Sequence, residues 1–170
     1  GAHWVDAGDL SLGNPATDFA VIERETGQLI DQGARVLAIG GDHSITFPLV
    51  AAHAKRYPGL TLLHFDAHTD LYDEYEGKRT SHACPFARIM EAGLAKRLVQ
   101  VGIRSLNAHT RAQAQRFGVE IIEMRRWTPG ALQSLPPLAG PLYLSLDLDA
   151  LDPAFAPGVS HHEPGGLSTR

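Results

Sequence analysis

The sequence predicts an α/β fold with a mostly parallel sheet, and two features of its pattern support this. Short apolar runs alternate with longer amphipathic segments along the 170 residues, and most of the runs lead into Gly or Asp. Buried parallel strands that are joined by crossover helices have this pattern. The composition, with 44% hydrophobic and 20% charged side chains, is that of a globular domain and excludes a disordered or fibrous chain.

Six apolar runs are predicted to form strands, and four segments between them are predicted to form helices. The expected strands cover residues 3–7, 35–39, 60–65, 97–101, 119–122 and 142–148. Apolar side chains at spacings of three and four predict the first helix over residues 19–30, and Gly33 ends it. Further helices are expected over 48–56, 85–91 and 108–117, whereas the Pro- and Gly-containing stretch 129–141 is predicted to be mostly loop.

Charge and cysteine content exclude several kinds of partner. Fifteen basic and nineteen acidic side chains give a net charge of -4, and the basic residues are scattered, which argues against a nucleic-acid partner. No apolar stretch approaches the roughly 20 residues that a membrane span needs, so no membrane partner is expected. Cys84 is the only cysteine, which excludes a disulfide within the chain, and we expect it to be a small buried hydrophobe.

The ends of the chain suggest a portion of a longer protein. The sequence begins at Gly1, and Ser168 and Thr169 would suit the start of a helix that does not follow. We therefore interpret residues 1–170 as one domain that is incomplete at both ends. The lone cysteine and the missing signal pattern predict a cytoplasmic location by default, although an absent N-terminal segment could carry a targeting peptide.

Acidic and imidazole side chains follow three of the predicted strands. His43 comes after the strand at 35–39, in a turn that begins with two glycines. Residues Asp66, His68 and Asp70 follow the strand at 60–65, and their spacing of two points them the same way in extended backbone. In open α/β sheets, ligands bind beyond the carboxyl ends of the strands, so these side chains lie where a site is expected.

The last strand adds two more carboxylates. Leucines at 144, 146 and 148 alternate with Ser145, Asp147 and Asp149, so the polar residues share one face of a strand that we expect to be buried. A lone His or Asp after a strand is commonly a solvated residue or a turn former. Several carboxylates gathered at one buried place are costly, however, unless a cation or a donor compensates them.

The charge count suggests two metal ions. Four carboxylates, from Asp66, Asp70, Asp147 and Asp149, would carry four negative charges, which two divalent cations would cancel. Carboxylate oxygens with two imidazoles and no thiolate favour Mn²⁺, ahead of Mg²⁺, Fe²⁺ or Co²⁺ and of structural Zn²⁺. Such a pair of ions would lower the pKa of a bound water enough to supply hydroxide near neutral pH.

The three motifs in this order resemble those of the ureohydrolases, the arginase and agmatinase family. They read Gly-Gly-Asp-His-Ser at 40–44, Asp-Ala-His-Thr-Asp at 66–70, and Ser-Leu-Asp-Leu-Asp-Ala-Leu-Asp-Pro-Ala-Phe-Ala-Pro-Gly at 145–158. The resemblance runs from about Asp6 to Arg170. It implies a three-layer α/β/α sandwich whose C-terminal part is missing from this chain. It also implies a trimer or hexamer, a small guanidino substrate, and hydrolysis of C–N bonds in linear amidines.

The resemblance further implies the ligands and the reaction of a binuclear manganese centre. His43, Asp66, Asp70 and Asp147 would bind one ion, and Asp66, His68, Asp147 and Asp149 the other. Asp66 and Asp147 would bridge the ions, and Asp70 would also hydrogen-bond a hydroxide that attacks the guanidinium carbon. His82 matches the family's active-site histidine, which delivers a proton to the leaving amine, and a pKa near neutrality suits that task.

Substrate choice rests on other positions. Arginases carry an Asn two residues after the second motif, and Tyr72 stands there, which argues against arginine and favours agmatine or another guanidino compound such as 4-guanidinobutyrate. Agmatine is the substrate that we expect, with arginine and 4-guanidinobutyrate as alternatives. Segments 73–90 and 158–167 look like the plant-type arginase and agmatinase branch, whose substrates are mixed. Glu163 and His161 lie in a loop at the same sheet edge, where the Glu163 carboxylate would attract an ammonium group. A further family Glu that holds the guanidinium lies beyond the end of this chain.

Three other functions fit these residues less well. A single-zinc amidohydrolase of the same broad fold would not need His43 and Asp70, which complete a second metal site. A metal-binding relative without activity would keep the ligands but release no product. A two-metal phosphatase or nuclease would need a basic clamp for phosphate, and the sequence places none beside the acids.

Overall fold

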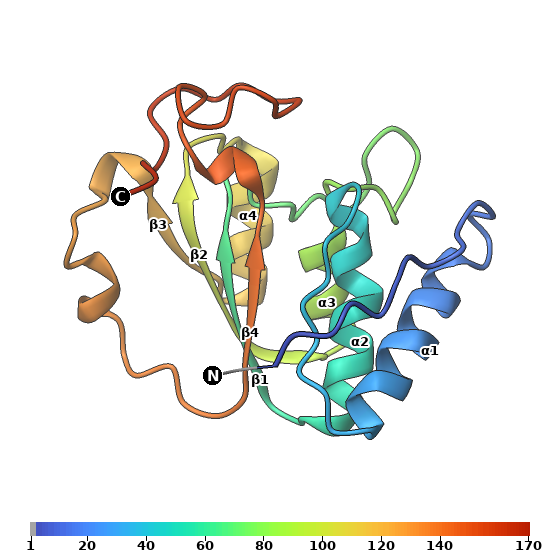
Figure 1. Cartoon of the computed structure of the whole chain (residues 1–170). Helices are drawn as coiled ribbons and strands as arrows, with labels where there is room; N and C mark the ends of the chain where they lie inside the picture. The colour runs from blue at the N-terminus through green and yellow to red at the C-terminus, as the bar shows by residue number, and fades with distance from the viewer. Residues whose placement is uncertain (1–2) are drawn as a thin grey trace.

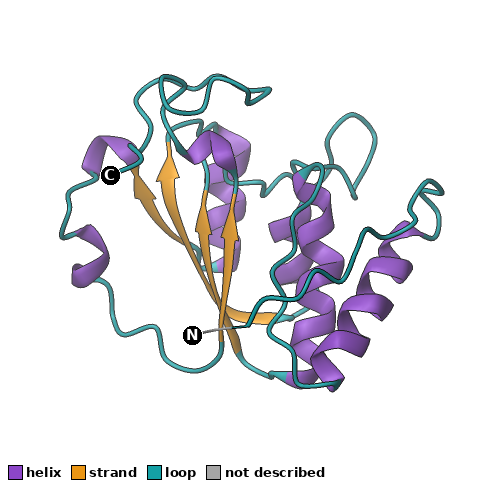
Figure 2. Cartoon of the chain, viewed as in Figure 1, coloured by secondary structure: helices purple, strands orange, loops and turns teal. Residues whose placement is uncertain are grey.

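The computed structural model describes residues 3–170 and contains a four-stranded parallel sheet with the order β3-β2-β1-β4. The strands are β1 (Leu60–Phe65), β2 (Ala95–Ile103), β3 (Glu120–Glu123) and β4 (Leu142–Leu146). All four point the same way, and the loops that follow them gather at their heads (Figure 2). The predicted α/β class with a parallel sheet is confirmed.

The four predicted helices are confirmed with small changes at their ends. They are α1 (Asp18–Asp31), α2 (Thr46–Arg56), α3 (Pro85–Glu91) and α4 (Ala108–Phe117), and four short 3₁₀ turns stand between the regular elements. A capping box between Asn107 and Thr110 starts α4, and Gly118 ends it in the left-handed conformation with φ of 64°. The stretch 129–141 is loop with one 3₁₀ turn at Ala131–Ser134, as predicted.

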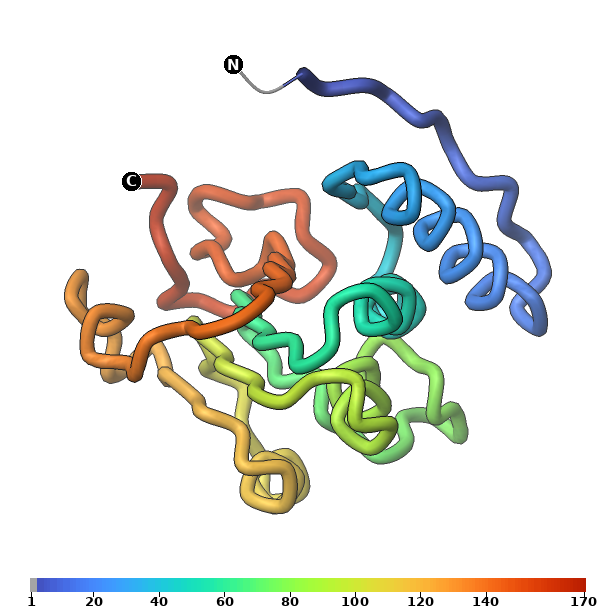
Figure 3. The backbone as a smooth tube through the Cα atoms, turned by 90° about the horizontal axis from the view of Figure 1, so that it is seen from below, coloured from blue at the N-terminus to red at the C-terminus, as the bar shows by residue number. Residues whose placement is uncertain are grey.

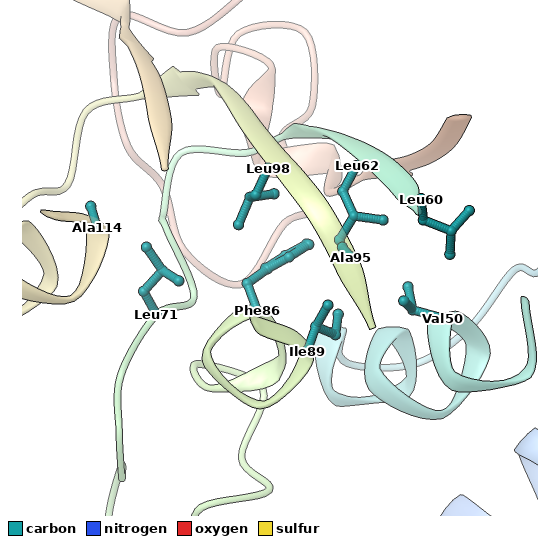
Figure 4. Close-up of a cluster of buried hydrophobic side chains, with 9 residues drawn as sticks. All are labelled: Val50, Leu60, Leu62, Leu71, Phe86, Ile89, Ala95, Leu98 and Ala114. Carbon is teal, nitrogen blue, oxygen red and sulfur yellow. The ribbon is translucent and has the colours of Figure 1, made fainter. Parts of the chain in front are cut away.

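The helices cover one face of the sheet. Helices α2, α3 and α4 bring Val50, Phe86, Ile89 and Ala114 against leucines of β1 and β2 in the main hydrophobic core (Figure 4). Helix α1 packs on α2 and lies outside it, away from the strands (Figure 3). The other face of β1 and β2 is covered by the irregular segment 124–141, through Trp127, Leu135 and Leu138 (Figure 1).

Two predicted strands are wrong. Residues 3–7 and 35–39 lie in irregular backbone and pair with no strand of the described chain. Trp4, Val5, Leu37 and Ile39 are all largely exposed. An apolar run has strand propensity, but it forms a strand only where a partner supplies ladder hydrogen bonds and a packed face, and these segments have neither.

The expectation that the last strand is buried is also wrong. Strand β4 is an edge strand that pairs only with β1 within residues 3–170, and it ends at Leu146 rather than at 148. Its alternation is as predicted, but the leucine face points to solvent, with Leu144 and Leu146 59% and 58% exposed. The polar face, with Ser145, is the buried one. Alternation alone fixes which residues share a face, and it does not say which face is covered.

Exchanging Leu62 for Ala tests the main core. Leu62 lies fully buried in β1, so Leu62→Ala is expected to lower the free energy of unfolding by about 2 to 5 kcal/mol through lost burial and the cavity left behind. Unfolding in urea measures this. The matched control Leu144→Ala, on the exposed face of β4, is expected to change it by less than about 0.5 kcal/mol. Equal losses from both variants would contradict the assignment of faces.

Candidate metal centre

The predicted ligands meet in a cleft of about 900 Å³ at the carboxyl edge of the sheet. Asp66 follows β1 directly, and His43 begins the 3₁₀ turn His43–Ile45 that precedes α2. Asp147 follows β4, and its side chain accepts a hydrogen bond from the backbone N–H of Asp149 at 2.9 Å. Asp149 is thereby turned toward β1, where its Oδ1 accepts from the Ala67 N–H at 3.1 Å.

Three carboxylates surround one nitrogen of His43. Its Nδ1 lies 3.0 Å from Asp70 Oδ2, 3.1 Å from Asp66 Oδ2 and 3.4 Å from Asp147 Oδ2. None of the three oxygens is aligned for a hydrogen bond, so this buried nitrogen has no partner. The other nitrogen, Nε2, is bonded to Ser145 Oγ at 2.9 Å. A ring held at Nε2, with Nδ1 free among carboxylates, is oriented as a metal ligand is.

A second group forms around His68. Its Nδ1 lies 3.1 Å from Asp149 Oδ2 and 3.4 Å from Asp66 Oδ1. Asp66 therefore directs one oxygen toward His43 and the other toward His68, and it is almost fully buried between them. Two sets of three side chains bring ligand atoms close enough to share an ion, namely His43, His64 and Asp66, and Asp66, His68 and Asp149.

The pKa values record an excess of negative charge. Burial and the charge of Asp66 raise the pKa of Asp70 to about 7. Burial by itself would lower the pKa of His68, but contacts with Asp149 and Asp66 raise it to about 10. The pKa of His43 is raised well above its usual value by Asp147, Asp66 and Asp70, against the effect of burial. Bound cations would replace these protons, because a metal ion stabilises ionised carboxylates and takes neutral imidazole. The donor set therefore fits a metal.

The backbone conformation of residues 66–70 and of the neighbouring strand β2 allows these side chains to come together. Asp70 lies in the left-handed region with φ of 48°, a conformation that Asp adopts more readily than most residues. Gly102, with φ of 95°, passes close to the Asp66 backbone, and a Cβ there would lie 2.9 Å from the Asp66 carbonyl oxygen. Close packing of β2 on this turn therefore requires glycine.

Two supporting residues were missed by the sequence reasoning. Gln100 is buried in β2 beside its register partner His64, and its Nε2 donates to His64 Nδ1 at 3.0 Å. This fixes the tautomer of His64, whose Nε2–H donates to Asp66 Oδ2 at 2.8 Å, so His64 is a buried residue that orients a candidate ligand. Arg104 donates to the carbonyls of Asp149 and Glu163, both at 2.6 Å. The sequence signal that could have revealed Gln100 is a polar Gln between apolar residues of a strand.

The predicted substrate residues surround the same cleft. Tyr72, His82 and His161 line it, and the ring of His161 lies 5.6 Å from that of His68 and 6.2 Å from that of His82. Glu163 Oε1 lies 3.6 Å from His68 Nε2. The hydroxyl of Tyr72 accepts a hydrogen bond from the Asn107 side chain, and its ring stacks on His109.

Comparisons with known proteins identify the family of the chain. The model of the Arginase family matches residues 1–170. The chain is 53% identical to a mitochondrial arginase 1 of Arabidopsis thaliana over 82% of this chain and 42% of that protein. It is 36% identical to an agmatinase of Bacillus subtilis over 99% of this chain and 59% of that protein. The arginase structure from Medicago truncatula superimposes with a TM-score of 0.85 and 48% identity, covering 91% of this chain and 51% of that one.

Fold and site together define an α/β protein with an acidic cluster of candidate metal ligands at the carboxyl edge of a parallel sheet. The chain belongs to the arginase family. It spans only part of the length of its curated relatives, 42% of the plant arginase and 59% of the bacterial agmatinase. The resemblance read from the three sequence motifs is confirmed. Within residues 3–170, no helix combines the length and the apolar character that crossing a bilayer demands.

Removing the central carboxylate tests the metal site. Because an ion that binds only the folded chain stabilises it, Mn²⁺ at about 100 times its dissociation constant should contribute about 2.7 kcal/mol and raise the melting temperature by several degrees. We expect this rise to be lost in Asp66→Asn. Asp42→Asn is the control, because Asp42 also lines the cleft but its carboxylate accepts from the Ser44 N–H at 3.0 Å. An equal rise in both variants would contradict the site.

Proposed function

We propose that the protein is a ureohydrolase with two manganese ions per chain, which hydrolyses agmatine to putrescine and urea. The observation that carries the proposal is the placement of Asp66, with one oxygen toward each of the two histidines, His43 and His68. A carboxylate in this place would bridge two ions. His43, Asp70 and Asp147 would complete one ligand set, and His68, Asp147 and Asp149 the other.

The chain's own residues would share the chemical work. Two bound divalent cations act as Lewis acids and lower the pKa of a bound water, so that a nucleophile is available near neutral pH. Asp70 would orient that nucleophile by a hydrogen bond, since its carboxylate lies beside His43. His82, which also lines the cleft, would hold the proton that the leaving amine takes up.

The charges that line the cleft favour agmatine. Five aspartates line it among the described residues, together with one arginine, Arg104, and no lysine. The guanidinium of Arg104 is engaged with backbone carbonyls of Gly102, Asp149 and Glu163, so it is not free to pair with a substrate carboxylate. Four of these aspartates are the candidate metal ligands, whose charge two divalent cations would cancel. Among the described residues that line the cleft, no arginine or lysine is then free to pair with the carboxylate of an amino acid, whereas agmatine carries no carboxylate and needs no such partner.

Arginine is the second candidate, and the sequence comparison favours it. Identity to the plant arginase is 53%, against 36% to the bacterial agmatinase. The reaction would be the same, and only the group at the far end of the substrate would differ. 4-Guanidinobutyrate carries a carboxylate but no amine. Its turnover therefore shows whether the cleft accepts a carboxylate at the far end of the substrate or requires an ammonium group there. Assembly into a trimer or hexamer and a cytoplasmic location stay predictions.

Urea release tests the activity. We expect the full-length, manganese-loaded protein to bind two metal ions per chain and to release urea from agmatine with a higher kcat/KM than from arginine or 4-guanidinobutyrate. A colorimetric urea assay and metal analysis of the same sample measure both quantities. Faster turnover of arginine would select the second candidate. Two metals with no urea from any of the three substrates would indicate a relative without activity, and less than one metal would overturn the binuclear centre.

Exchange of Glu163 tests the substrate's distal contact. Its carboxylate lies at the cleft beside His68, so Glu163→Gln is expected to lower kcat/KM for agmatine relative to arginine by about tenfold, through loss of an attraction for the ammonium group. Glu74→Gln, an exposed acid on the segment after Tyr72, is the matched control and should leave the ratio unchanged. An unchanged ratio in Glu163→Gln would remove Glu163 from substrate selection.

A further inference from the structure

One irregular loop supplies much of the cleft wall. The segment 72–84, which we call the wall loop, contributes four residues to the lining of the cleft, Ala83 and the three ring side chains Tyr72, Tyr75 and His82. Its two ends are held together by a hydrogen bond from the Tyr72 N–H to the Ala83 carbonyl at 3.0 Å. Its tip is a turn closed by hydrogen bonds in both directions between Tyr75 and Lys78, at 3.1 and 2.9 Å. These contacts shape the loop, and Tyr72 and the Asp73 N–H tie its start to Asn107 and His109.

A buried arginine attaches the wall loop to α3 as well. The Arg88 side chain is 9% exposed, and its Nη2 lies 2.9 Å from Asp73 Oδ1 of the wall loop and 3.1 Å from Glu91 Oε2 of its own helix. Its Nε and Nη1 are buried without a partner. A buried cation is costly unless it is paired, so the two carboxylates are held firmly at this guanidinium. Of the two, only Asp73 belongs to the wall loop.

A second, exposed arginine completes a four-charge network. Arg79, near the far end of the wall loop, places Nη1 2.8 Å from Asp73 Oδ1 and Nη2 2.9 Å from Glu91 Oε2. Asp73 therefore receives two guanidinium groups, and contact with Arg88 and Arg79 holds its pKa below the usual value. The network joins both arms of the wall loop to α3. Arg88 is the most buried of the four side chains, so solvent screens its charge least.

We propose that Arg88 is a positioning residue which, through Asp73, holds the wall loop against α3 and so sets Tyr72, Tyr75 and His82 at the cleft. Arg88 itself does not line the cleft. Its effect on the reaction rests on the function proposed above, because the wall matters to turnover only if a substrate binds there. Its effect on the loop does not depend on that function.

Cys84 provides a reporter for the loop that is independent of activity. It is the only cysteine and is fully buried, and its Sγ–H points to the Lys78 carbonyl at the loop tip at 3.6 Å. Opening of the wall loop would expose this thiol to a reagent such as dithionitrobenzoate. Cleavage by trypsin after Lys78 is a second reporter, and it does not depend on the ionisation of the thiol.

The test compares Asp73→Asn with Arg116→Gln in the full-length protein. Arg116 is exposed and reaches Glu91 at 3.5 Å, but it makes no ion pair with the wall loop. In Asp73→Asn we expect Cys84 labelling and Lys78 cleavage to speed up by about tenfold, because local opening becomes easier. We also expect KM for the guanidino substrate to rise by about tenfold with kcat changed less than about threefold. Arg116→Gln should match the wild type.

Further variants separate positioning from general stability. Asp73→Glu, which keeps the charge, should recover most of the protection, and Arg88→Gln should reproduce Asp73→Asn where it folds. Wild-type rates of labelling and cleavage in Asp73→Asn would overturn the proposal, and so would faster opening with unchanged KM. If the wild type releases no urea, the proposed function fails, and the labelling and cleavage rates still decide whether Arg88 holds the loop.

Discussion

The gathering of carboxylates at the head of β1 is the constraint on which the rest of the structure depends. Asp66 and Asp70 are buried within a few ångströms of the Nδ1 of His43, and Asp147 and Asp149 approach from β4. Like charges at this distance repel strongly where solvent is excluded. Burial and the charge of Asp66 accordingly raise the pKa of Asp70 to about 7. Ion binding and correct folding of this edge are therefore coupled in the function proposed above.

The parts of the fold around this edge serve to fix the acids. Gln100 and His64 form a buried relay that ends on Asp66, and Gly102 lets β2 approach the same backbone. Arg104 joins the turn after β4 to the loop that carries Glu163. These contacts come from a neighbouring strand and from distant loops. Removing one of these contacts would shift a candidate metal ligand without deleting it. We therefore expect the loss of such a contact to lower the affinity for the metal.

The sequence predicted which acidic and imidazole side chains gather at this edge, because their signals are local. A strand followed by Asp66, His68 and Asp70 places its own side chains, and helix α4 carries its start and stop signals at Asn107 and Gly118. Residues 35–39 were mispredicted because strand formation depends on a partner elsewhere in the chain, which an apolar pattern does not reveal. The burial of the β4 leucines was mispredicted for the same reason, because an apolar pattern does not reveal which face of a strand is covered. Gln100 and Arg104 act through contacts across the sheet or across tens of residues, so spacing alone could not assign their roles.

The division between rigid and irregular elements bears on substrate choice. The candidate metal ligands stand in the first turns after β1 and β4 or at the start of the 3₁₀ turn before α2, where sheet hydrogen bonds and packing limit movement. Tyr72, Tyr75, His82, His161 and Glu163 lie instead on loops whose positions depend on ion pairs and on Arg104. A change in such a loop alters the cleft wall without disturbing the acids. The reaction centre can therefore be kept while specificity changes, which is consistent with arginases and agmatinases both matching this chain.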